Sequence, residues 1–104
     1  MKDRRQFKVV IEQKVFDDIL VLYSYVCQDS ISEAAHVRDA LLAAIRSLAD
    51  FPERYPYFVG ETVSAGRFRK MVVLGRFLVF YRVCGEEVYI IRVIDGKQDY
   101  KWLL

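Results

Sequence analysis

The spacing of apolar residues changes near residue 67 of this 104-residue chain, and this change restricts its fold more than any other feature. Before residue 52, apolar residues recur every three or four positions, as in helices that face a core. After residue 66 they alternate with polar residues, as in strands. A short β-branched run at residues 7–13 precedes the helical region and indicates a first strand. The order predicts an α+β fold in a single domain, residues 1–104.

The helical region divides into two segments. Residues 15–28 have a predicted apolar stripe, and Asp17 and Asp18 lie in its first turn, where the helix dipole favours negative charge. That stripe consists of Phe16, Ile19, Leu20, Tyr23, Val26 and Cys27. Residues 31–50 start with a capping box, Ser30 and Glu33, and end before Pro52. Their stripe consists of Ala34, Val37, Leu41, Ala44, Ile45 and Leu48. The short connection predicts an antiparallel helical hairpin.

Three consecutive strands are predicted after the helices, at residues 67–74, 76–84 and 87–94. Gly75 and the pair Gly85-Glu86 leave only tight links between them, so we expect antiparallel pairing in one sheet. Residues 52–66 contain two prolines and two glycines and are predicted to be a loop. A short C-terminal tail follows the last strand.

Alternation in the middle strand assigns its two faces. The apolar set Phe77, Val79, Tyr81 and Val83 should lie under the helical hairpin. The opposite face then becomes a candidate basic face, with Arg69, Arg76, Arg82 and Arg92. Residues 64–104 hold eight basic and four acidic residues, whereas residues 1–63 hold eight and ten. Such an asymmetry favours an acidic partner for the strand-rich half, and a merely solvated basic surface is the alternative.

Several classes of function lack support in the sequence. The chain has no apolar run of about 20 residues that could span a bilayer and no signal-peptide core, so we expect a cytoplasmic protein that does not enter a membrane. His36 is the only histidine, and the two cysteines lie 57 positions apart, so no metal site is predicted. We find no Gly-rich phosphate loop and expect no cofactor.

At the level of motifs, the chain resembles the RelE/ParE superfamily of bacterial toxins from type II toxin–antitoxin systems. The resemblance covers nearly the whole length. It rests on "LADFP" (48–52) at the end of the helical hairpin, "GRFRKMVVLGRFLVFYRV" (66–83) and "IIRVIDGKQDY" (90–100). The order and spacing of these segments match the family, and no single motif is decisive.

One branch of that superfamily consists of RelE-like nucleases that cut messenger RNA on the ribosome, without a metal. By resemblance, the residues that would serve this activity here are Arg69, Arg92, Lys97 and Tyr100. Three positions depart from the nuclease pattern. Asp95 stands where many members have histidine, Gln98 where arginine is frequent, and Leu78 where the nuclease branch has a strand arginine. A convincing acid–base pair is therefore missing, and the hypothesis that the chain is an enzyme is the less favoured one.

The ParE-like branch is favoured. Its resemblance implies a growth-inhibiting, plasmid-stabilising toxin that inhibits DNA gyrase by binding it. In this reading Tyr100, Trp102, Leu103 and Leu104 form a target-binding tail, because these residue types serve as anchors at interface hot spots. The alternative is a structural role, in which Trp102 and Leu103 only pack on the sheet edge. A third possibility is a non-toxic protein of the same fold that binds an antitoxin.

The resemblance also implies a cognate antitoxin that wraps the toxin and neutralises it. The candidate surface includes Tyr25, Ala35 and Leu42 of the helices, together with the tail. The toxin–antitoxin complex would bind operator DNA through the antitoxin.

Overall fold

The computed structural model describes residues 6–60 and 63–97, so the predicted tail lies outside the described residues. The first part of the chain forms β1 (Lys8–Ile11), α1 (Gln13–Cys27) and α2 (Ile31–Arg46), followed by two 3-10 turns, Ser47–Ala49 and Pro52–Arg54. The second part forms β2 (Tyr57–Gly60), β3 (Val63–Val73), β4 (Phe77–Cys84) and β5 (Glu87–Asp95). The predicted α+β order is confirmed.

The strands form one mixed sheet in the order β1-β5-β4-β3-β2. Strands β3, β4 and β5 pair antiparallel as predicted, whereas β1 returns to the far side of β5 and pairs parallel to it. The loop predicted for residues 52–66 is wrong, because β2 and the start of β3 lie within it. Both prolines of this region precede β2. Strand β2 lies at the edge of the sheet and pairs only with β3, and its apolar run is short.

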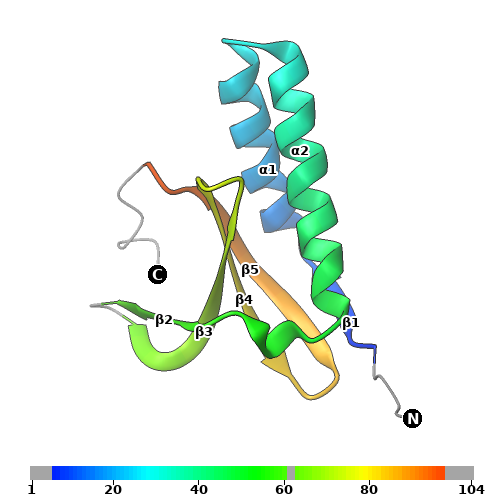
Figure 1. Ribbon diagram of the computed structural model, residues 1–104, viewed down its shortest axis with the longest axis vertical. Coiled ribbons are helices and arrows are strands. Elements are labelled where there is room, and N and C mark those ends of the chain that lie inside the picture. The colour runs from blue at the N-terminus through cyan, green and yellow to red at the C-terminus, as the bar shows by residue number, and fades with distance from the viewer. Residues whose placement is uncertain (1–5, 61–62, 98–104) are drawn as a thin grey trace.

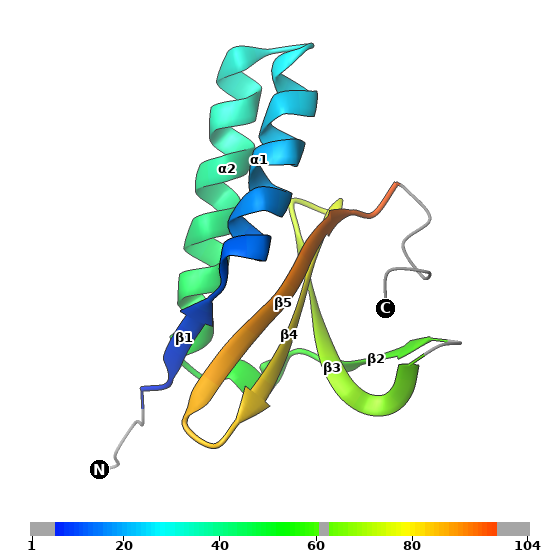
Figure 2. The same cartoon turned by 180° about the vertical axis from the view of Figure 1, so that it is seen from behind.

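The helical hairpin covers one face of the sheet, and α1 lies beside β5 (Figures 1 and 2). The main core fills the space between these layers. It includes Phe77, Val79 and Tyr81 of β4, so the predicted assignment of that face is confirmed. Facing them are Leu41 and Ile45 of α2, both fully buried. None of the helices in residues 6–60 and 63–97 is long and apolar enough to cross a membrane.

Helix α2 follows its sequence closely. Its predicted stripe is buried, except that Ala44 is half-buried. The Ser30 side chain accepts a hydrogen bond of 3.1 Å from the Glu33 amide, which is the expected N-cap. The reciprocal half of the capping box does not form as predicted, because the Ser30 amide donates to the Val26 carbonyl at the end of α1. The short link between the helices thus uses that amide to close the hairpin.

Helix α1 buries a different stripe from the predicted one. Its buried residues are Val15, Asp18, Ile19, Leu22 and Val26. Phe16 and Leu20, which the spacing placed in the core, are 45% and 62% exposed. The prediction was wrong because it started the helix at residue 15 and assigned Asp17 and Asp18 to its first turn, whereas α1 starts at Gln13 and its first turn holds no acidic residue. An ion pair allows Asp18 to be buried. The face of α1 that meets the core is therefore shifted by about one residue from the predicted face.

A second, smaller core lies on the sheet face opposite the helices. Strand β3 bends strongly along its length, and β2 follows this bend (Figure 1). As a result Phe58 of β2 meets Phe80 of β4 edge to face, with ring centroids 5.2 Å apart. Leu78 and Ile94 complete this cluster. A sheet with one small covered area on its far face leaves room for binding surfaces beside it.

Candidate functional site

A groove runs along the exposed side of the helical hairpin. Ile19 and the two exposed residues Phe16 and Leu20 line it from α1, beside Tyr23, and α2 contributes Arg38 and Leu42. Its volume is about 320 Å³, and its lining is mostly apolar. The residues that the predicted core stripe misplaced therefore form this groove. Among the residues predicted to contact an antitoxin, Leu42 lines the groove, Tyr25 is exposed elsewhere on α1, and Ala35 is half-buried.

Arg92, a predicted phosphate-binding residue, is held by α1. Its Nε and Nη2 atoms donate to the two carboxylate oxygens of Asp18 at 2.9 and 3.1 Å. The amide of Val93 donates to the same carboxylate at 3.0 Å. Both side chains are largely buried, 20% exposed for Arg92 and 7% for Asp18. Because this carboxylate neutralises it, the Arg92 guanidinium serves the packing of α1 on β5.

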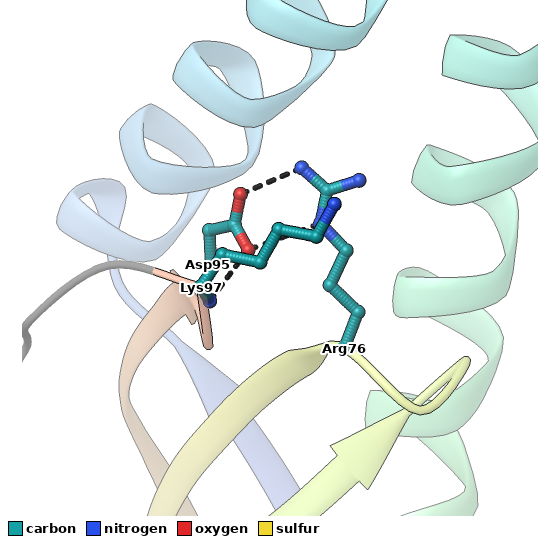
Figure 3. Close-up of polar contacts among 3 residues, drawn as sticks. All are labelled: Arg76, Asp95 and Lys97. Atoms are coloured by element: carbon teal, nitrogen blue, oxygen red, sulfur yellow. Dashed lines mark hydrogen bonds and ion pairs between the residues drawn. The ribbon is translucent and has the colours of Figure 1, made fainter.

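Arg76 forms a second two-point ion pair, with Asp95 at the end of β5 (Figure 3). Its Nε and Nη2 atoms lie 3.0 and 2.7 Å from the carboxylate oxygens. The amide of Lys97 donates to the same carboxylate at 3.0 Å. These hydrogen bonds, above all those from Arg76, hold the pKa of Asp95 below its ordinary value. The carboxylate is therefore a poor proton acceptor at neutral pH.

Arg69 lies beside the turns that precede β2. Its Nη1 atom donates to the carbonyl oxygens of Tyr55 and Glu53 at 2.7 and 3.1 Å. Its guanidinium also stacks on the Tyr57 ring, 4.0 Å from the centroid. Arg82 of β4 is exposed. Of the four predicted arginines, three hold the fold together and one faces solvent.

The predicted basic face does not form, because the structure does not bring these arginines together. Arg69 pairs with the core residue Tyr81 and so lies on the helix-covered face, opposite Arg82. A bulge in β5 shifts the register between Phe80 and Tyr81 of β4, and Arg92 reaches α1 as a consequence. The prediction assumed ordinary register throughout.

Few of the described residues are suited to act as a general acid or a general base. Burial raises the pKa of Tyr81 to about 12, and its hydroxyl donates to the Pro52 carbonyl inside the core. Lys97 is exposed two positions after the end of β5, and its amide donates to Asp95. Tyr100, the last residue of the nuclease hypothesis, lies outside the described residues, as do Trp102, Leu103 and Leu104.

The burial of Asp18 was missed from the sequence alone, whereas an antitoxin surface on the helices was predicted, with only Leu42 among the residues that line the groove. The burial of Asp18 had one available signal, its place between apolar residues three and four positions on either side, Val15 and Leu22. The groove had another: α1 carries apolar residues on more than one stripe. A broader apolar surface than one core face requires is a sign of a partner groove.

Comparison with known protein families assigns the chain to one of them. The model described as the ParE toxin of the type II toxin-antitoxin system parDE matches residues 9–100. The chain belongs to the ParE toxin family. This membership covers both helices and all five strands except the first residue of β1. The suspected superfamily is thereby confirmed, in its ParE branch.

One similar solved structure is described as the chromosomal ParDE toxin-antitoxin system from P. aeruginosa. It is 17% identical in sequence, with a TM-score of 0.69, and the match covers 88% of this chain and 97% of the other. At this identity the likeness shows the fold alone. No curated protein matches the chain. In this chain the two-point pairs at Arg76 and Arg92 hold the fold together, and the apolar helix groove is left open for a partner.

Proposed function

We propose that this chain is a toxin that inhibits DNA gyrase by protein–protein contact in the cytoplasm, and that a cognate antitoxin neutralises it. One observation carries the choice of contact over catalysis: Arg69 and Arg92, the arginines a nuclease would use, are committed to partners within the fold. An arginine that binds a scissile phosphate must be free to meet it as charge develops.

The proton chemistry supports the same choice. RNA cleavage needs one group that accepts the 2′-hydroxyl proton and another that protonates the leaving oxygen. Asp95 occupies the position of the family's histidine, and its lowered pKa and ion pair with Arg76 make it an ineffective base. Tyr81 keeps its proton up to very high pH. Neither residue is therefore suited to take or give a proton in RNA cleavage.

Neutralisation by an antitoxin fits the helix groove. An apolar groove between two helices takes one face of an amphipathic helix, with side chains entering at helical spacing. Leu20 and Phe16 offer exposed apolar contact area, and Leu42 provides the opposite wall. We expect the antitoxin segment to be acidic beyond the groove, because residues 64–104 carry twice as many basic as acidic residues.

Contact with gyrase is assigned to the tail. Tyr100, Trp102, Leu103 and Leu104 combine aromatic and apolar side chains, of which tyrosine and tryptophan are the types most enriched at interface hot spots. The structure of the described residues brings the chain to the surface at Lys97, three positions before Tyr100. A target-binding element could therefore start directly beyond β5.

The deciding experiment adds the intact purified chain to two reactions. The first measures gyrase-mediated cleavage of plasmid DNA, and the second measures cleavage of messenger RNA on translating ribosomes. We expect accumulated gyrase-cleaved DNA and intact message, and relief by the product of the neighbouring antitoxin gene. Message cut at ribosomes with gyrase unaffected would establish the RelE-like activity instead. Inactivity in both reactions, with antitoxin binding retained, would establish a non-toxic binding protein.

A further inference from the structure

A second hollow lies away from the helix groove, between the β3–β4 turn and the end of β5. We call it the turn notch, and it has a volume of about 350 Å³. Val72 and Leu78 provide its apolar floor, on the sheet face opposite the helices. Its rim consists of Gly75, Arg76, Gly96 and Lys97. The notch therefore combines an apolar floor with two cationic side chains at its edge.

Several contacts fix the shape of the turn notch. Arg76 grips Asp95 with two hydrogen bonds, and the Gly96 amide donates to the Arg76 carbonyl at 2.8 Å. The two segments approach so closely that a Cβ atom at Gly96 would lie 2.5 Å from that carbonyl oxygen. Only glycine fits there without a shift of the backbone. A preformed site of this kind loses little entropy on binding.

The turn itself carries an unusual residue at its tip. Leu74 and Gly75 have φ angles of +56° and +66°, and the Arg76 amide donates to the Val73 carbonyl at 3.1 Å. These are the features of a type I′ turn, whose first central position favours asparagine, aspartate or glycine. Leucine is disfavoured there, and yet it is 48% exposed and gains little from burial. Backbone strain at an exposed apolar residue points to a function for its side chain.

We propose that Leu74 and the turn notch form a contact surface for the protein target of the toxin, separate from the helix groove. The matching partner segment has an apolar side chain that enters over Val72 and Leu78, beside a carboxylate that meets Lys97. Val72 is 51% exposed and Lys97 is exposed as well, so both are accessible. Arg76 contributes less charge because Asp95 already neutralises it.

The target is favoured over the antitoxin as the occupant because of where the notch lies. Lys97 is part of its rim and stands three positions before the tail assigned to the target. A partner that contacts the tail at its origin therefore reaches the notch without a further segment. The antitoxin helix has an apolar groove of its own on the helical hairpin. This inference rests on the proposed function and adds a second contact to it.

Two substitutions test the turn notch in the full chain. Leu74→Asn removes the apolar side chain and supplies a residue suited to the turn, so the Tm should stay the same or rise. Lys97→Glu reverses the charge at the rim, and Lys14→Glu on α1 makes the same change in charge away from it. The affinity of each variant for purified gyrase and for the cognate antitoxin is measured, together with accumulation of gyrase-cleaved DNA.

We expect Leu74→Asn and Lys97→Glu each to weaken gyrase binding about tenfold or more, with antitoxin affinity unchanged and Lys14→Glu like the intact chain. Full gyrase binding by both variants would overturn the turn-notch inference while the proposed function stands. Loss of antitoxin affinity instead would assign the notch to the antitoxin and would contradict the inference. Failure of the intact chain to bind gyrase would overturn the proposed function itself, and this inference with it.

Discussion

Asp18 on α1 and Arg92 on β5, 74 positions apart in the sequence, meet through two parallel hydrogen bonds of 2.9 and 3.1 Å. The pair joins the helical hairpin to the last strand and also takes up the amide of Val93. It converts a predicted catalytic arginine into a structural one. The same pair determines which side of α1 faces the core and which side is left to line the groove.

Removing Asp18 should therefore destabilise the fold strongly. Asp18→Ala leaves the Arg92 charge buried without a partner, and breaking such a pair costs about 3–5 kcal/mol. Asp17→Ala is the matched control, since the neighbouring aspartate is exposed and should change stability by only about 0.5 kcal/mol or less. Urea unfolding followed by circular dichroism measures both. Equal stability of the two variants would mean that the pair does not hold α1 to β5.

The Arg76–Asp95 pair predicts a dependence of stability on pH. The folded-state pKa of Asp95 lies below its unfolded value, so its ionised form stabilises the fold above the unfolded value of about 4. This contribution is lost as the pH falls through the folded pKa. The free energy of unfolding of the intact chain should thus exceed that of Asp95→Asn at pH 7, and the difference should shrink below pH 4. A difference that stays constant down to pH 2 would exclude the pair as its cause.

Tyr81 is predicted to be a structural tyrosine. Tyr81→Phe leaves the buried Pro52 carbonyl without its donor and should cost about 1–3 kcal/mol of stability. Tyr57→Phe, at a half-exposed position, should be close to neutral. In a titration of the tyrosines by NMR, one ring should ionise only near pH 12, and Tyr81→Phe should remove that signal. Loss of toxicity from a stable Tyr81→Phe variant would argue for a chemical role instead.

The helix groove predicts that two neighbouring apolar residues on α1, Leu20 and Val21, differ in their effect on antitoxin binding. Leu20 lines the groove, whereas Val21 is equally exposed, at 67%, but lies outside it. Leu20→Ala should weaken binding of the cognate antitoxin by about 2 kcal/mol if the residue is a hot spot, while Val21→Ala leaves it unchanged. Isothermal titration calorimetry gives both affinities. The groove assignment fails if the two substitutions have the same effect.

The parts of the fold that could be predicted from sequence are those that local chemistry determines. Ser30 caps α2 as expected, Pro52 follows its end, and the period-two runs around Gly75 and Gly85 became β3, β4 and β5. Strand β2 was missed because a proline precedes its four residues and the last of them is a glycine, and both are loop signals when read locally. Its pairing depends on the bend of β3, a property of the whole sheet.

The candidate site was harder to predict because its key contacts are distant in sequence. An aspartate on α1 gives no local sign that an arginine 74 positions later will neutralise it. A bulge in β5 changes which face its residues reach, and bulges are not visible in a pattern of alternation. From the sequence, Arg69 and Arg92 could be predicted only to lie on strands. Their partners, which decide their roles, came from the tertiary structure.

The most direct test of a toxin that works by contact is a deletion of residues 102–104. Without the anchors Trp102, Leu103 and Leu104, the toxin should no longer accumulate gyrase-cleaved plasmid DNA, because each hot-spot contact contributes about 2 kcal/mol or more. Unfolding of the shortened chain in urea, measured in parallel, should show that it remains folded. We predict that a folded, shortened chain leaves gyrase free to reseal DNA. Gyrase trapped as fully by the folded deletion as by the intact chain would contradict it.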